Sequence, residues 1–402
     1  MFRPYIKQTK ILVFIACINL FLVYISYKSY TFEPLENYDL KMETALIMSD
    51  ALAHTKNLYV SLDLEANKLE IDEDDSTYDV FDSGLIGLRG SIMTTKMGYL
   101  KSKKAVTNPN FAPIFIDYFS KIDPSLLDPN TPDTIAVSLT GSFPGANIAL
   151  LSVCKSLNIY PVIISSMGSS SWGANQTEMT WLDIENYLFE HEVFNYRSSA
   201  FSLGGDNDIM SELNDGIKDT LRKKILDNNY IFIYDSVLNN SANKRIEVYA
   251  RKSKNYKAYI NIGGSSASLG DTLTSTMYLP GLIYGRDKNI EDAYDEEFYY
   301  ADFSTKPTID HFLEIENIPV INIKNINNLC AWYDLPYDYE DYNEETTLIG
   351  SSSVLFGSKI PFHPIVLWIC LMMSLLLLGW IVWTSILQVN DKMKEIDNES
   401  II

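Results

Sequence analysis

The sequence is poor in basic side chains and offers few side chains that could bind a metal. Its 402 residues include 32 lysines and arginines against 52 aspartates and glutamates, which gives a net charge of −20. Proteins that bind nucleic acid need a basic surface to neutralise phosphates, so this balance excludes nucleic acid as a partner. The four cysteines and four histidines include no cysteine pair at zinc-site spacing, so we predict no metal site.

The cysteines are also poorly placed for a disulfide framework. Cys17 and Cys370 lie inside apolar segments, so only Cys154 and Cys330 could meet in a folded domain. These two lie far apart in the sequence, and we expect both to be buried free thiols rather than partners in a disulfide.

Several motifs that would identify a chemistry are missing. No Gly-Lys-Ser/Thr sequence follows a Gly-rich turn, which excludes a P-loop, and GSFPGAN at 141–147 lacks the G-x-G-x-x-G spacing of a dinucleotide site. The nucleophile elbow G-x-S-x-G is absent as well. A Ser-His-Asp hydrolase has little support because no histidine lies in a Gly/Ser-rich loop, whereas a Ser-Lys dyad that uses Lys96, Lys101, Lys103 or Lys104 stays open. The sequence therefore indicates no particular cofactor and leaves open whether the protein is an enzyme.

What the sequence does have is two long uncharged apolar runs, at 11–27 and 365–387. The first is near the short limit for a transmembrane helix and could be a cleaved signal peptide, but no small-x-small cleavage site follows it, so we favour an uncleaved signal anchor. The second is long enough to span a membrane and carries tryptophans towards its ends, which suit the headgroup region. Because the tail at 1–10 is basic, we predict that it and the tail at 388–402 are cytoplasmic, in a two-pass protein of the cell membrane whose soluble domain is extracytoplasmic.

The region between the apolar runs divides by composition into three parts. The block 28–80 contains a helical pattern at 38–56, which either packs on a sheet or rises from the bilayer as a stalk, and an acidic loop at 70–79. An α/β domain is predicted over 81–345, and a Ser/Gly/Pro-rich linker over 346–364 leads into the second run.

The fold class follows from the stretch 133–175, around which the rest of the chain is organised. An apolar run there ends in a Gly-rich turn, and a helical pattern, a second apolar run and a polar loop follow, which together predict one βαβ unit. Further strands are predicted at 200–203, 230–234, 258–262 and 320–323, with helices between them. This alternation predicts an α/β fold with a mostly parallel, doubly wound Rossmann-like sheet covered on both faces.

Four polar loops follow predicted strands, at 141–147, 165–175, 204–208 and 263–270. The carboxyl ends of parallel strands meet at one edge, where glycines let a backbone approach a ligand and helix N-termini offer N–H donors. We therefore predict a site for a carboxylate or phosphate there. Its candidate ligand-binding residues are Ser142, Asn147, Ser170, Trp172, Asn175, Asp206, Ser266 and Ser268, with Thr94 and Thr95 as additions.

Two of these candidates have a second interpretation. Trp172 is unusual in a polar loop, and it either stacks on a ligand or covers the edge of the core. The sequence Asp206-Asn207-Asp208 resembles a D-x-D metal-nucleotide pair, but a turn at the end of a strand explains it equally well.

Several blocks of the sequence, taken together and in order, resemble the poly-gamma-glutamate system protein family. The blocks are GLIG at 84–87, Thr94-Thr95, Lys103 with TNPNFA at 107–112, GSFPxxN at 141–147, ISSMGSSSWGAN at 164–175, SLGGDND at 202–208 and NIGGSSASLG at 261–270. The resemblance covers about 84 to 270. It implies membership in a membrane-bound system that makes or exports poly-gamma-glutamate, with the other subunits of that complex as partners and a role in capsule biosynthesis. It supplies no reaction and no catalytic residue.

Three functions remain open on this basis. The protein could be an accessory subunit whose α/β domain binds polymer, a chain end or a partner subunit at the sheet edge. It could be a hydrolase or transferase that acts on gamma-glutamyl amide bonds, which requires an activated nucleophile or a metal. It could also be an anchor without a ligand that holds synthase subunits together through its two spans.

Overall fold

In the computed structural model, residues 4–64, 78–285 and 306–399 are described. The chain forms two compact units, one made of Met1–Leu35 with Gly357–Ile402 and the other of Glu36–Phe356. Most of the acidic loop predicted at 70–79 lies outside the described residues.

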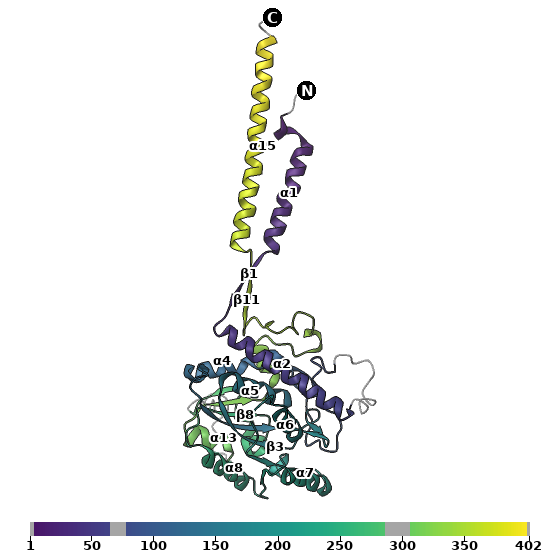
Figure 1. Cartoon of the computed structure of the whole chain (residues 1–402), viewed down its shortest axis with the longest axis vertical. Coiled ribbons are helices and arrows are strands. Elements are labelled where there is room, and N and C mark those ends of the chain that lie inside the picture. The colour runs from purple at the N-terminus through teal and green to yellow at the C-terminus, as the bar shows by residue number, and fades with distance from the viewer. Residues whose placement is uncertain (1–3, 65–77, 286–305, 400–402) are drawn as a thin grey trace. The chain divides into compact units, whose positions relative to one another are not determined.

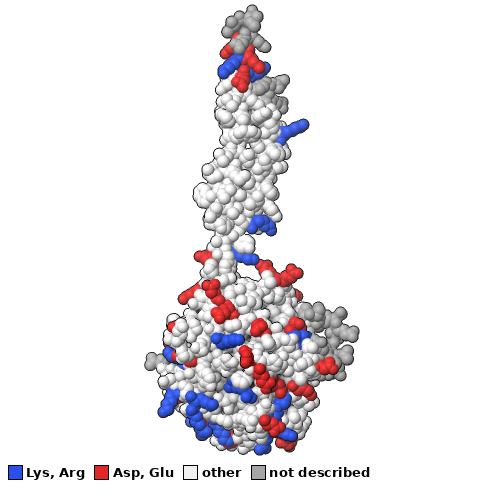
Figure 2. Space-filling model, viewed as in Figure 1, with Lys and Arg blue, Asp and Glu red and all other residues white. Residues whose placement is uncertain are grey.

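The terminal unit consists of two apolar helices and a small sheet (Figure 1). α1 (Thr9–Lys28) and α15 (Pro364–Glu399) are long and apolar enough to cross a membrane. At about 1.5 Å per residue, α1 reaches about 30 Å, the thickness of a bilayer's hydrocarbon core. Figure 2 shows charged side chains at the ends of the paired helices and an uncharged stretch between them. Next to the helices, β1 (Tyr30–Pro34) pairs antiparallel with β11 (Gly357–Pro361).

The structure corrects two predicted boundaries. The helix predicted at 38–56, which could have been a stalk, is α2 (Tyr38–Ser61). It packs on α5 (Pro144–Leu157) in the α/β unit and buries Ala45, Met48 and Leu52. The predicted linker is folded: Leu355 and Phe356 belong to the core of the same unit, and the next five residues form β11. The burial of Leu355 and Phe356 could not be predicted from the Ser/Gly-rich composition around them, because it depends on side chains far away in the sequence.

The α/β unit is built on a seven-stranded sheet with the order β7-β6-β3-β2-β8-β10-β9. Neighbouring strands are parallel except for β9, which pairs antiparallel with β10. The sheet is therefore mixed and mostly parallel; its antiparallel edge strand was not predicted. The strands are β2 (Thr134–Thr140), β3 (Tyr160–Ser166), β6 (Ala200–Ser202), β7 (Ile231–Ile233), β8 (Tyr259–Ile262), β9 (Gly281–Ile283) and β10 (Val320–Ile323).

Helices cover both faces of this sheet (Figure 1). Ile135 and Val137 of β2 belong to the larger core cluster, whereas Ala136 between them belongs to the smaller one, as alternating side chains of a doubly buried strand must. α2, α4, α5 and α6 contribute to the larger cluster, and α8, α9 and α13 to the smaller one. The helices are α3 (Leu100–Ala105), α4 (Pro113–Ile122), α5 (Pro144–Leu157), α6 (Trp181–Glu190), α7 (Asp215–Asp227), α8 (Leu238–Lys252), α9 (Ser266–Leu269), α10 (Thr272–Thr276), α13 (Thr308–Asp310), a π-helix over His311–Ile315 and α14 (Ile326–Trp332).

The strand order places a change of direction at the middle of the sheet. From β2 the chain adds β3, β6 and β7 on one side, and it then returns to place β8 on the other side of β2. In open α/β sheets, ligands bind in the crevice at the carboxyl ends of the strands where the order reverses. We therefore expect a ligand-binding site in the crevice outside β2 and β8.

The two cysteines of the α/β unit are buried free thiols, as predicted. Burial raises the pKa of Cys330 to about 12, and it raises that of Cys154 as well. At neutral pH both are protonated and therefore unreactive.

Glu185 of α6 makes the unit's stability depend on pH. It is 2% exposed, and the Ser198 backbone N–H and hydroxyl donate to its two oxygens at 2.8 and 2.6 Å. Burial raises the pKa of Glu185 from 4.5 to about 7. Between these values the folded state binds more protons than the unfolded state, so stability falls as pH rises.

We expect Glu185→Gln to remove this pH dependence. Relative to the variant, the wild type should lose about 3 kcal/mol of unfolding free energy between pH 4.5 and pH 7. Urea unfolding of the detergent-solubilised chain at several pH values measures the difference. The expectation would be contradicted if the unfolding free energies of the wild type and the variant changed equally with pH.

Candidate functional site

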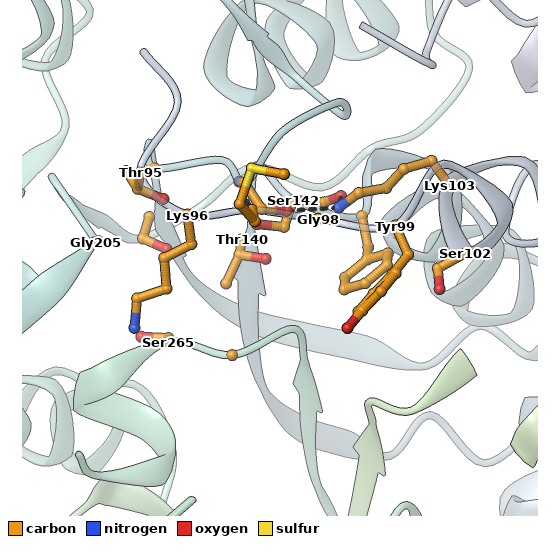
Figure 3. A pocket seen from close by; sticks show the side chains of 16 residues that line it. Thr95, Lys96, Gly98, Tyr99, Ser102, Lys103, Thr140, Ser142, Gly205 and Ser265 are labelled. Carbon is orange, nitrogen blue, oxygen red and sulfur yellow. Dashed lines mark hydrogen bonds between the residues drawn. The ribbon is translucent and has the colours of Figure 1, made fainter. Parts of the chain in front are cut away.

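A cavity of about 220 Å³ lies at the carboxyl ends of β2, β3, β6 and β8 (Figure 3). Each of the four polar loops predicted to converge contributes lining residues. From these loops come Ser142 and Phe143, Gly168 and Ser170, Gly205, and Gly264 and Ser265. The strands that carry them are all parallel to one another, which is why their ends meet.

The rest of the cavity wall comes from α3, which contributes Ser102 and Lys103, and from residues 85–99, here called the covering segment. This segment lies along the loop after β3 and bonds to it through the backbone. Gly173 N–H donates to a carbonyl of the covering segment at 2.6 Å and Ser171 N–H to another at 2.7 Å, while Thr95 N–H donates back to the loop at 2.9 Å. These bonds bring Lys96, Gly98 and Tyr99 to the cavity.

Gly98 is required at its position because the covering segment approaches the loop so closely. A Cβ added at Gly98 would lie 2.5 Å from the Ser171 carbonyl oxygen and 2.9 Å from Ser170 Oγ. Real Cβ atoms do not come this near, so only glycine lets the backbone pass beside the Ser170 hydroxyl.

Two lysines line the cavity although the chain as a whole is strongly acidic. Among the described residues, the lining includes Lys96 and Lys103 and no aspartate or glutamate. Lys96 is about half exposed and forms an ion pair with Asp206 at 2.9 Å. In Figure 3 its side chain extends towards Ser265, while Lys103 reaches towards Ser142. A protonated lysine in a cavity attracts anions locally even when the net charge of the chain is unfavourable.

Lys103 is the most unusual group in the cavity. Only 2% of the residue is exposed, and its ammonium nitrogen donates to the Ser142 carbonyl oxygen and, at 2.9 Å, to Ser170 Oγ. Nζ also lies 3.9 Å from the centre of the Phe143 ring. Burial lowers the pKa of Lys103 from 10.5 to about 7, because the ammonium has lost most of its hydration.

Two hydroxyl groups in the cavity wall have no hydrogen-bond partner among the described residues. Thr140 Oγ1, at the end of β2, and Ser265 Oγ, after β8, are both buried and both line the cavity. Each residue is 4% exposed. Buried polar groups are nearly always paired, so we expect each of these hydroxyls to bond to a ligand or a water.

A buried ion pair holds the loop after β6 in place. Arg245 Nη2 of α8 donates to Asp208 Oδ1 at 2.8 Å, and both side chains are at most 1% exposed. The Ser202 and Ser241 hydroxyls also donate to this carboxylate. Asp208 therefore has a structural role. The D-x-D interpretation of 206–208 fails because Asp208 pairs with Arg245, whereas Asp206 pairs with Lys96.

Three of the predicted site residues line the cavity: Thr95, Ser142 and Ser170. Asp206 lies at its edge, where it pairs with the lysine of the covering segment. Ser266 is next to a lining residue, but its hydroxyl donates to a backbone carbonyl at 3.1 Å. The four loops therefore meet at one edge of the sheet, as predicted, and the binding of a ligand there stays a prediction.

The other five predicted residues support the loops instead of lining the cavity. Asn147 donates to a carbonyl at the end of β2 at 3.0 Å, and Asn175 bonds both backbone groups of one residue in the covering segment, at 2.9 and 2.6 Å. Ser268 shares a hydrogen bond with a serine of β2 at 2.6 Å. Trp172 packs edge-on against Tyr78, with the ring centres 5.6 Å apart, and Thr94 forms a backbone bridge to the loop after β3.

Sequence patterns missed or undervalued several lining residues. Thr140 and Ser265 looked like ordinary strand-end residues, and Tyr99 had no distinguishing context. Lys103 lies in a K-S-K-K run, which is typical of a solvated surface.

Comparisons with known proteins do not assign this site: no protein-family model, no curated protein and no solved structure matches the chain. The chemistry must be argued from the arrangement itself. The cavity combines two lysines, unpaired hydroxyls and a serine in contact with the buried lysine. Such a site can hold an anionic group, and it can also supply a nucleophile.

Proposed function

We propose that this chain is a membrane-anchored component of a poly-gamma-glutamate synthesis or export system. Its doubly wound, Rossmann-like α/β domain lies on the extracytoplasmic side of the cell membrane, with both tails in the cytoplasm. There it binds a carboxylate-bearing ligand, which is the polymer, a chain end or a partner subunit of the complex.

The observation that carries the ligand class is the presence of two lysines in the cavity. In a chain of net charge −20, the described lining holds Lys96 and Lys103 and no carboxylate. The unpartnered hydroxyls of Thr140 and Ser265 add neutral donors. Charged and neutral donors together suit a carboxylate. The ordered sequence blocks between 84 and 270 support the choice of polymer, and the two apolar helices support the membrane anchor.

A titration of the full-length chain in detergent with gamma-linked glutamate oligomers tests the proposal. We expect saturable binding at low salt that weakens as salt is added, because the attraction is electrostatic. Lys96→Gln should weaken binding about 10-fold, since a hydrogen bond to a charged group contributes about 1.5–3 kcal/mol.

Lys101→Gln is the matched control for this titration. Lys101 is exposed on α3, lies outside the cavity and pairs with Asp338 at the surface, so its loss should leave the affinity unchanged. The proposal fails if the wild type shows no binding at low salt, or if an uncharged oligomer of the same length binds equally well.

The enzyme alternative, a hydrolase or transferase of gamma-glutamyl amide bonds, is favoured by one specific observation. Lys103 Nζ lies 2.9 Å from Ser170 Oγ inside the cavity.

A further inference from the structure

Ser170 and Lys103 have the geometry of a nucleophile beside its base. Ser170 Oγ is 2.9 Å from Lys103 Nζ, and both residues line the cavity, with Lys103 almost fully buried. The serine is held from two sides. Its backbone N–H donates to Ser142 Oγ at 3.0 Å, and the glycine of the covering segment lies against its hydroxyl. A nucleophile within hydrogen-bond reach of an oriented base is the arrangement that covalent catalysis requires.

Burial without a counter-charge among the described residues favours a neutral amine at Lys103. A buried lysine with a purely structural role is normally paired with a carboxylate, because an isolated buried charge is unfavourable. No ion pair of Lys103 occurs within residues 4–64, 78–285 and 306–399. Its described contacts are the Ser142 carbonyl, the Ser170 hydroxyl and the Phe143 ring. Burial without a counter-charge lowers the pKa of Lys103 to about 7, although these contacts would themselves favour the ammonium.

A neutral Lys103 can still donate to the Ser142 carbonyl, and it can accept a hydrogen bond from the Ser170 hydroxyl instead of donating one. One of its N–H groups still donates to the Ser142 carbonyl, which fixes the nitrogen in place. Its lone pair is then free to accept the proton of the Ser170 hydroxyl. Proton transfer needs no movement of either side chain, since the heavy atoms are already at hydrogen-bond distance.

We propose that Ser170 is an acyl-accepting nucleophile and Lys103 its general base, acting on an amide bond in a carboxylate-bearing chain. The substrate class rests on the function proposed above: Lys96, on the other side of the cavity, would hold a carboxylate of the chain while an amide carbonyl lies next to Ser170. Gamma-linked glutamate provides both groups in every repeat. The unpartnered Thr140 and Ser265 hydroxyls are available as donors to the bound chain.

The reaction balances with water as the only additional reactant. Ser170 Oγ bonds to the amide carbon as its proton passes to Lys103 Nζ, and the C–N bond then breaks as Lys103 returns that proton to the leaving amine. The product is an acyl ester on Ser170. Water attacks this ester, gives one proton to Lys103, and releases the carboxylic acid as the proton returns to Ser170. If an amine replaces water, the same steps transfer the chain instead of cleaving it.

A fluorophosphonate probe tests the nucleophile without any assumption about the substrate. The full-length chain in detergent is incubated with the probe, and the modified residue is located by mass spectrometry. We expect phosphonylation of Ser170, with loss of fluoride. Ser170→Ala and Lys103→Met should each lower labelling at least about 100-fold, because the two residues act as a unit.

Ser171→Ala is the matched control, since Ser171 is the next residue in the same loop but does not line the cavity. Its hydroxyl contacts only the Met97 sulfur among the described side chains, at 3.8 Å, and labelling should stay at the wild-type level. Thermal melting of each variant confirms that it is folded. The inference is overturned if the folded wild type is not labelled, or if labelling persists in Ser170→Ala or Lys103→Met.

The glutamate-oligomer titration separates this inference from the proposed function. Binding without labelling overturns the nucleophile and leaves the ligand class standing. Labelling without binding supports the nucleophile and overturns the polymer as its substrate.

Discussion

Lys103→Met is expected to make the folded protein more stable at pH 6, although it removes the proposed base. The pKa of Lys103 falls from 10.5 in the unfolded chain to about 7 on folding. Between these values the unfolded state binds more protons, so the stability of the wild type rises with pH across this window. At pH 6 the full penalty of burying the ammonium is present, and it amounts to about 5 kcal/mol.

Methionine fills the space of the lysine stem but cannot bond to Ser142 or Ser170, and these lost bonds offset about 1–3 kcal/mol of the gain. The variant should therefore be about 2–4 kcal/mol more stable than the wild type at pH 6. By pH 10 most of the penalty of burying the ammonium is gone, so the wild type should be more stable than Lys103→Met. Urea unfolding at pH 6, 8 and 10 measures the crossing.

Lys101→Met, on the same helix but exposed, is the control for this experiment and should show no such crossing. A Lys103→Met variant that is less stable than the wild type at pH 6 would show that the buried ammonium is well compensated. If the expectation holds, loss of probe labelling in this variant cannot be ascribed to unfolding. A residue that lowers stability but is needed for activity is typical of a functional site.

Asp208→Asn is expected to destabilise the α/β unit by about 3–5 kcal/mol, because it leaves the Arg245 guanidinium buried without a counter-charge. Asparagine is the replacement that best isolates the loss of the charge. Asp208 has a left-handed backbone with φ 63°, which asparagine tolerates better than most residues. The substitution therefore removes charge while keeping the shape and the backbone conformation.

The double variant Asp208→Asn with Arg245→Met should regain most of this loss, since it removes both charges. The neighbouring surface pair of Lys244 and Asp235, 2.9 Å apart, is the matched control, and Asp235→Asn should change stability by less than about 1 kcal/mol. Urea unfolding of the four proteins gives the comparison. Equal losses for Asp208→Asn and Asp235→Asn would mean that burial of the first pair has no energetic consequence.

The same ion pair bears on the cavity. The loop after β6 contributes Gly205 to the lining and Asp206 to the pair with Lys96. Because Asp208 fixes this loop to α8, its loss should weaken ligand binding as well as folding.

The regular part of the fold could be predicted because its signals are local. The runs that became β2 and β3 are apolar on both faces, and the Gly-rich turns after them mark where each strand ends. β9 has only three residues, too few for a periodic pattern. The covering segment has no periodicity either, since its position is set by backbone bonds to a loop some 80 residues later, such as Ser171 to Lys96.

The site could be predicted as a place but not as a set of side chains. Serines and asparagines at strand ends either face a ligand or satisfy nearby backbone groups, and the sequence does not separate these roles. Ser170 does the first and Asn175 the second, although they lie in the same loop. Lys103 could not be found as a buried lysine, because burial depends on how α3 packs in three dimensions.

The pairing of β1 with β11 has a consequence for how the chain is threaded. Pro34 lies opposite Gly357, so the polypeptide leaves the terminal unit and comes back to it at neighbouring points. Residues 36–356 are therefore an insertion between two strands whose ends are side by side. Such an insert can be excised and closed by a short peptide, circularly permuted, or grafted between the strands of another hairpin without stretching its own ends.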